Sequence, residues 1–78
     1  MMNERTKQQI CIKAYDNLGA LERILRVIRH RGAHIENLTM QIEDQHIFAL
    51  VLTCTTERSV SALCNQINKL VDVISVEI

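Results

Sequence analysis

The chain contains 78 residues, 47% of them hydrophobic, and it has no proline. This length is enough for one domain, whose core buries only about 60% of the surface that the unfolded chain exposes. Lysine plus arginine and aspartate plus glutamate both total 9, so the overall charge argues against nucleic acid or an anionic membrane as a partner.

The first predicted element is a strand from Gln8 to Tyr15, in which apolar and polar side chains alternate. We expect residues 1–7 to form a polar N-terminal extension and residues 8–78 to form a single domain. The longest apolar run, Ile47 to Leu52, is far shorter than the roughly 20 residues of a membrane-spanning helix. The sequence therefore predicts a soluble, cytoplasmic protein.

A turn of sequence DNLG follows this strand and leads into a predicted helix from about Leu18 to Arg31. Basic side chains and Gly32 end this segment, as is typical of a helix C-terminus. Apolar residues recur at helical spacing and predict the buried face of the helix: Leu18, Leu21, Leu25 and Ile28.

The rest of the chain is predicted to form two strands, a helix and a last strand. Alternation predicts a strand from about His34 to Glu43, and the turn EDQ joins it to the strand HIFALVLTCT. That third strand is apolar on both faces, which is typical of a central strand or of one covered from outside the monomer. Thr56 or Ser59 is a possible cap of a second helix, and VDVISVEI predicts the fourth strand.

The order strand, helix, strand, strand, helix, strand is that of the ferredoxin-like βαββαβ fold, an α+β architecture. In this fold a four-stranded antiparallel sheet carries both helices on one face. The other face has no covering element in the monomer, so we expect its apolar side chains to contact a partner or a ligand. Because the fold supports many activities, function has to be inferred from the site.

Residues that carry catalysis or bind metals are sparse. There is no G-x-S-x-G motif, and His30, His34 and His46 lack the short spacing of a zinc site, so we expect no catalytic residues and no metal. One tyrosine and one phenylalanine offer almost no platform for stacked bases, which argues against RNA recognition. Three widely spaced cysteines are predicted to be buried thiols: Cys11, Cys54 and Cys64.

The predicted first helix carries the main basic concentration of the chain. Arg23, Arg26 and Arg29 recur every three residues and therefore lie near one side of the helix. They form either a solvated outer face or a surface that docks on an acidic surface of another protein. The zero net charge favours protein docking over phosphate binding.

The DNLGAL loop joins the end of a strand to the start of a helix, where unpaired N–H groups and the helix dipole can hold a carboxylate. Gly19 would let a ligand approach the backbone closely. Asp16 or Asn17 could engage a ligand amine or could cap the helix. A capping loop without a ligand is the alternative interpretation.

Two blocks of the sequence match a known family. DNLGALERILRVIRHRGAHIENLTM, followed by INKLVDVISVEI, resembles the ACT domain of the small, regulatory subunits of acetolactate synthase (acetohydroxyacid synthase). RILRVIRHRG together with NKLVDV is most similar to the short, isozyme II type of small subunit. The resemblance covers nearly the whole chain and implies the same βαββαβ fold.

The resemblance also implies a homodimer in which the sheets meet edge to edge, an isologous arrangement. In family members that sense amino acids, the effector lies between the first-strand turn of one subunit and the second-strand start of its neighbour. Valine-sensing members typically carry asparagine at two of these positions, where an amide could donate to the ligand carboxylate and an aspartate would oppose it. The two positions hold Asp16 and His34 in this chain, and the full set is Asp16, Asn17, Leu18, Gly19 and Ala20 in the turn, with His34 and Ile35 in the strand.

What the resemblance predicts is a noncatalytic regulatory or activating subunit that binds the large, catalytic subunit of acetolactate synthase in branched-chain amino-acid biosynthesis. Thiamine diphosphate, magnesium and FAD would belong to the large subunit, and this chain would hold no cofactor. The predicted docking residues are Arg23, Arg26 and Arg29, and a branched-chain amino acid is the candidate effector. The alternative is a free-standing amino-acid-binding ACT module that regulates another enzyme or a transcription system.

Overall fold

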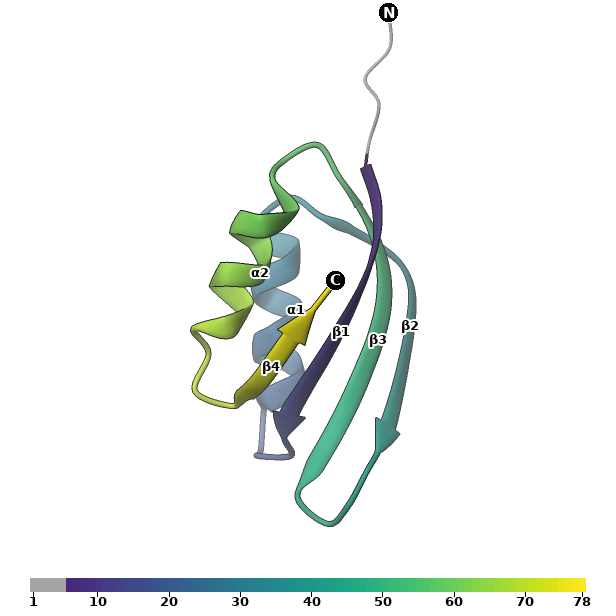
Figure 1. The fold of residues 1–78 in the computed structure, drawn as a ribbon. Helices are drawn as coiled ribbons and strands as arrows, with labels where there is room; N and C mark the ends of the chain where they lie inside the picture. Colours follow the sequence, from purple (N-terminus) through teal and green to yellow (C-terminus); the bar gives the residue numbers. More distant parts are fainter. Residues whose placement is uncertain (1–5) are drawn as a thin grey trace, which may run out of the picture.

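Strands and helices follow the predicted order in the computed structural model, which describes residues 6–78 (Figure 1). The elements are β1 (Thr6–Tyr15), α1 (Ala20–His30), β2 (His34–Ile42), β3 (Ile47–Thr56), α2 (Val60–Asn68) and β4 (Val73–Glu77). The order of elements read from periodicity is therefore confirmed.

The boundaries of the first two elements differ from the predicted ones. β1 begins at Thr6 instead of Gln8, and residues 1–5 of the predicted extension lie outside the described residues. α1 begins at Ala20 instead of Leu18, because Gly19 has a φ of 81°. A residue in this left-handed conformation is not part of a right-handed helix, so the turn before α1 is longer than predicted.

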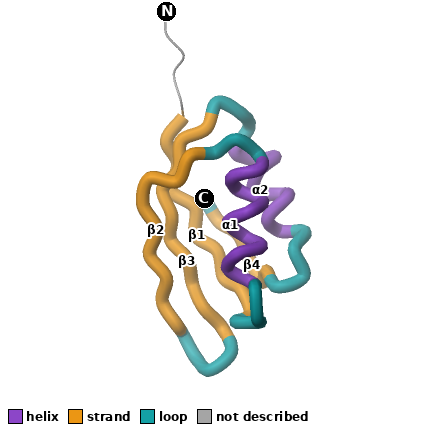
Figure 2. The backbone as a smooth tube through the Cα atoms, turned by 180° about the vertical axis from the view of Figure 1, so that it is seen from behind, coloured by secondary structure: helices purple, strands orange, loops and turns teal. Residues whose placement is uncertain are grey.

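The four strands form one antiparallel sheet in the order β2-β3-β1-β4, and both helices cover the same face (Figures 1 and 2). This arrangement confirms the ferredoxin-like fold. β3 pairs with β1 from Thr6↔Thr56 to Tyr15↔Ile47, and its other side pairs with β2. β3 is thus a central strand, one of the two predicted alternatives, although the helices bury only one of its two apolar faces, and β2 and β4 are the edges of the sheet.

The core lies between the sheet and the two helices, where apolar side chains leave water. On α1 the buried residues are Ala20, Ile24 and Ile28, so the predicted buried face is correct only for Ile28. The apolar residues of α1 form one broad stripe, and contact with the sheet selects which line of residues along this stripe is buried. The remaining core residues are Ile10, Ile12, Ala14, Ala33, Phe48, Leu50, Leu52, Cys54, Leu63 and Ile67.

The sheet face that the helices leave open is mixed, because β1 places mainly polar side chains there and the central strand β3 places apolar ones, among them the exposed Val51. On β1 this face carries Gln9, Cys11 and Lys13, which alternate with the buried Ile10 and Ile12. Further exposed apolar side chains gather along the edge strand β2, whose hairpin with β3 extends past the helices (Figure 2). They are Leu38, Met40 and Ile42, and they pair with the buried Leu52, Leu50 and Phe48, so they point toward the helix-covered face.

The second helix begins with a side-chain cap at Ser59. The Ser59 Oγ accepts a hydrogen bond from the Ala62 backbone N–H at 3.1 Å. Ser59→Ala removes this acceptor, and we expect the free energy of unfolding to fall by about 1 kcal/mol. The matched control is Ser61→Ala within the same helix, which should change it by less than about 0.5 kcal/mol. Equal losses for both variants in urea denaturation would contradict the capping role.

Candidate functional site

The turn between β1 and α1 is held in shape by backbone hydrogen bonds. The Asn17 N–H donates to the Tyr15 carbonyl at 2.8 Å, and the Ala20 N–H donates to the Asn17 carbonyl at 3.0 Å. The Asp16 N–H donates to the carbonyl of His46 at 2.7 Å, which ties the turn to the start of β3. No side chain caps the N-terminus of α1, so neither Asp16 nor Asn17 has the capping role considered from the sequence.

The turn is also anchored by a buried carboxylate from the other end of the chain. Asp72, which is 1% exposed, accepts hydrogen bonds from Asn17 Nδ2 at 2.9 Å, from Arg23 Nε at 2.8 Å and from Arg23 Nη2 at 3.1 Å. Arg23 Nη2 donates as well to the Leu18 carbonyl at 3.0 Å, and the Tyr15 N–H donates to the Asp72 carbonyl at 2.8 Å. We call Asn17, Arg23 and Asp72 the turn clamp.

Asp72 and Arg23 of the turn clamp stabilise each other's charged forms. The hydrogen bonds from Arg23, and then from Asn17, hold the pKa of Asp72 below its usual value, although burial acts in the opposite direction. The same hydrogen bond from Arg23 to Asp72 raises the pKa of the guanidinium. The two hydrogen bonds between the Arg23 guanidinium and the Asp72 carboxylate also fix the orientation of these two groups relative to each other. Because the pair bonds to Asn17 and to the Leu18 carbonyl, it holds the turn in one shape.

Sequence reasoning did not identify Asp72 as a site residue. Its one signal is an acidic residue inside the apolar segment KLVDVISV, because a carboxylate rarely lies among apolar residues without a partner. The partner could not be read from periodicity, since Asn17 is 55 residues away and Arg23 is 49 residues away. The clamp therefore joins the two blocks on which the family resemblance rests.

Gly19 has a structural role that needs no ligand. Its φ of 81° strongly favours glycine, and a Cβ atom at this position would lie 2.8 Å from Arg23 Nη1. The guanidinium thus occupies the space that the missing side chain leaves. The close approach to the backbone that Gly19 permits is therefore made by Arg23 of the same chain.

The seven predicted effector residues form two separate groups within one chain. Asp16 to Ala20 lie at the start of α1, whereas His34 and Ile35 follow its other end (Figures 1 and 2). The 11 residues of α1 place the groups roughly 16 Å apart along the helix axis. Asp16 and Leu18 are exposed, and the amide nitrogen of Asn17 is already bound to Asp72.

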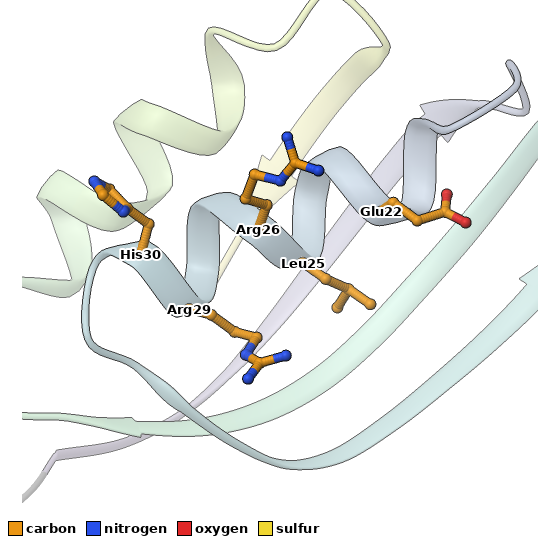
Figure 3. A pocket seen from close by; sticks show the side chains of 5 residues that line it. All are labelled: Glu22, Leu25, Arg26, Arg29 and His30. Carbon is orange, nitrogen blue, oxygen red and sulfur yellow. The ribbon is translucent and has the colours of Figure 1, made fainter.

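The three predicted docking arginines have different surroundings. Arg23 belongs to the turn clamp, whereas Arg26 and Arg29 are exposed. In Figure 3, Arg26 and His30 point away from the β2 side of the helix, and Leu25 and Arg29 point toward it. A shallow surface is lined by these four residues and Glu22, so Arg26 and Arg29 share one surface that does not include Arg23.

Other candidate groups lie apart from the turn. Burial raises the pKa of the Cys54 thiol and of the partly buried Cys64 thiol, but Cys11 is exposed on the open sheet face, so its predicted burial is wrong. Within residues 6–78, no three histidine, cysteine or acidic side chains are placed to hold a metal ion. None of the described helices is both long and apolar enough to cross a bilayer.

Comparison with known proteins matches residues 16–76 to the ACT domain family. The chain is 42% identical over 73 residues to the acetolactate synthase isozyme 2 small subunit of Escherichia coli strain K12, covering 92% of this chain and 84% of that protein. The same identity and coverage apply to the acetolactate synthase isozyme 2 small subunit of Shigella flexneri.

Solved structures of low sequence identity share the fold. The ACT domain of a GTP pyrophosphokinase from Chlorobium tepidum superimposes with a TM-score of 0.82 at 22% identity, covering 95% of this chain and 97% of that one. A homoserine dehydrogenase from Thiobacillus denitrificans matches with a TM-score of 0.73 at 23% identity, covering 96% of this chain and 17% of that enzyme. These two likenesses establish the architecture only.

Proposed function

Because the chain belongs to the ACT domain family and is a relative of the acetolactate synthase isozyme 2 small subunits, we propose that it is the regulatory small subunit of an acetolactate synthase. The observation that carries the proposal is 42% identity over 92% of the chain. The chain contributes no catalytic residue, and the reaction belongs to a large subunit, which serves branched-chain amino-acid biosynthesis in the cytoplasm. Thiamine diphosphate, magnesium and FAD belong to that large subunit.

Regulation in this proposal is a shift between two states of the large subunit. The small subunit activates only if it binds the active conformation more tightly than the inactive one. A domain that docks for this purpose needs a fixed shape, since ordering it during binding would reduce the affinity. The turn clamp supports such a role, because Asp72 fixes the turn at the start of α1 through three side-chain hydrogen bonds.

The proposed small subunit is a homodimer through its sheet edges. The nine residues of β2 pair with β3 on one side only, and the free side exposes unpaired backbone groups that favour another strand. Two copies of β2 pair antiparallel about an axis perpendicular to the sheet. The result is one continuous sheet of eight strands, with all helices on the same face.

This dimer unites the two separated groups of predicted effector residues. Antiparallel pairing of β2 reverses α1 of one subunit relative to α1 of the other, so the Asp16–Ala20 turn of one lies near the His34–Ile35 segment of its neighbour. We place a branched-chain amino acid there as the candidate effector. Asp16 opposes the effector carboxylate, and Asn17 is committed to Asp72, so we expect weak binding of valine, leucine and isoleucine.

Docking on the large subunit is assigned first to Arg26. Of the three predicted arginines, it is the one that is neither bound to Asp72 nor turned toward β2 (Figure 3). Its exposed guanidinium suits an acidic surface and a bidentate carboxylate contact.

Reconstitution tests the proposed function. Addition of the purified chain to its large subunit should raise acetolactate formation, and the two proteins should co-elute. Arg26→Glu should raise the concentration needed for half-maximal activation roughly tenfold, because it places like charges at the docking surface. Lys69→Glu, the same charge reversal on the exposed end of α2, is the control and should leave activation unchanged.

The same mixture of chain and large subunit distinguishes the proposed small subunit from the alternative, a free-standing regulatory module. No activation and no co-elution would reject a small subunit of acetolactate synthase. Calorimetric binding of a branched-chain amino acid by that inactive chain would then support the alternative regulatory module. Activation without any calorimetric signal at millimolar amino acid would retain the subunit and remove the effector.

A further inference from the structure

A groove lies between α1 and α2, on the flank of α1 that is turned away from β2. Its hollow of about 310 Å³ is lined by Arg26, Val27, His30, Arg31 and Gln66, and we call these five residues the helix groove. In Figure 3, Arg26 and His30 point to the side of α1 on which α2 lies. Val27 is partly buried and packs against the core, so the groove has an apolar floor and a basic rim.

The basic side chains of the helix groove have no acidic partner within residues 6–78. The ion pairs of this part of the chain engage Lys7, Lys13 and Arg23 instead. The sequence of α2, VSALCNQIN, contains no charged residue. Glu22, one turn before Arg26, is the nearest acid along α1 and does not line the groove. The positive charge of the rim is therefore not neutralised by the domain itself.

A further cation extends this positive charge to the loop before α2. Arg58 is exposed, and its Nε atom lies 4.0 Å from the place that a Cβ on Gly32 would take, just after the end of α1. Its acidic neighbour in sequence, Glu57, does not line the groove. Because the net charge of the chain is zero, this flank is a local concentration of one sign.

We propose that the helix groove receives an acidic segment of the large subunit, whose carboxylates bind Arg26 and Arg31 while an apolar side chain packs on Val27. This inference rests on the proposed function and deepens it by naming the groove and the chemistry of the segment that it binds. Guanidinium groups suit carboxylates because they donate two hydrogen bonds in one plane. The apolar floor between the two arginines favours a peptide, which carries apolar and acidic groups together, over a free inorganic anion.

The homodimer of the proposed function leaves the helix groove open. That dimer forms through the edge strand β2, whereas the groove lies on the other flank of α1, beside α2. A twofold axis gives both subunits the same surroundings, so one dimer presents two equivalent grooves on the helix-covered side of its sheet. Each groove can bind one large subunit.

Gln66 on α2 provides a test that leaves every basic side chain of α1 in place. Gln66→Glu adds a charge that repels an acidic segment, and Gln66→Lys adds one that attracts it. The dissociation constant of the complex with the large subunit should rise roughly threefold in the first variant and fall roughly threefold in the second. The matched controls are Asn65→Glu and Asn65→Lys, at an exposed position that does not line the groove, and they should leave the constant unchanged. Circular dichroism checks that every variant is folded.

Zero-length cross-linking with a carbodiimide tests the chemistry of the bound segment. In the complex, the amine introduced by Gln66→Lys should form an amide with a carboxylate of the large subunit, and peptide mass spectrometry then locates that carboxylate. Asn65→Lys should give no cross-link at the introduced amine.

Opposite shifts for the two Gln66 variants, with unchanged Asn65 variants, would support the helix groove. Equal affinity of the parent and both Gln66 variants would overturn the groove while leaving an activating small subunit. Shifts that appear instead in the self-association of the isolated chain, measured by sedimentation equilibrium, would assign the groove to a second copy and overturn it as well. A parent chain that neither binds nor activates the large subunit would reject the proposed function, and the groove with it.

Discussion

Replacement of Asp72 by asparagine is expected to destabilise the domain more than any other single polar substitution within residues 6–78. The carboxylate accepts three hydrogen bonds from side chains, two of them from Arg23, and asparagine removes the countercharge while placing an amide against these donors. We expect a lower midpoint in urea denaturation and loss of the ordered Asn17 side-chain resonances in NMR spectra. Asp16→Asn, the same chemical change at an exposed position of the same turn, should have little effect on either.

The stability difference between the parent and Asp72→Asn should depend on pH in one direction. Because the pKa of Asp72 is lowered in the folded protein, its contribution is fully present above the unfolded value of about 4 and is lost as the pH falls through the folded pKa. The two urea midpoints should therefore differ most near neutral pH and converge in acid. A constant difference between pH 7 and pH 2 would show that the charge of Asp72 does not stabilise the turn clamp.

Gly19→Ala is expected to lower the free energy of unfolding and to loosen the turn clamp. An alanine in the left-handed conformation costs about 1–2 kcal/mol relative to glycine, and the new Cβ would lie 2.8 Å from Arg23 Nη1. Since the guanidinium is held by Asp72 and by the Leu18 carbonyl, it can relieve this contact only by weakening those bonds. We expect the pKa of Asp72, measured by NMR titration, to rise in this variant.

Gly32→Ala is the matched control for this effect. Gly32 has a φ of 84°, so alanine there has a similar backbone cost, but the nearest atom to its Cβ would be Arg58 Nε at 4.0 Å. The extra loss of stability in Gly19→Ala therefore measures the contact with Arg23. If both variants lost the same stability and left the pKa of Asp72 unchanged, Gly19 would act through its backbone conformation alone.

Periodicity was sufficient to predict the fold because each strand and helix has its own local pattern. The alternation in β1 predicted a strand with one buried face, which it has, and the apolar β3 predicted either a central strand or one covered from outside the monomer, of which the central position is observed. Periodicity failed on α1, where Ile24 is buried and Leu25 is only partly so, because both fit a helical spacing. A broad apolar stripe does not specify in the sequence of the helix which of its residues lie nearest to the sheet.

The candidate site was predictable only in its local part. The turn at Gly19 was identified from turn chemistry, and its positive φ agrees with that prediction. Asp72 was missed, since hydrogen bonds between residues 49 and 55 positions apart leave no periodic signal. The exposure of Leu18 was not predicted either, because Leu18 was assigned to the buried face of the helix, whereas the helix starts only at Ala20.

The turn clamp also has a consequence for the order in which the chain folds. The β1 to α1 turn is local in sequence, yet its final geometry requires a residue 55 positions later. Closing so long a loop costs conformational entropy that is repaid only after the intervening elements have packed. The surface around Gly19 is thus completed when Asp72 enters the core beside β4, so a turn made from adjacent residues becomes one of the last features of the domain to form.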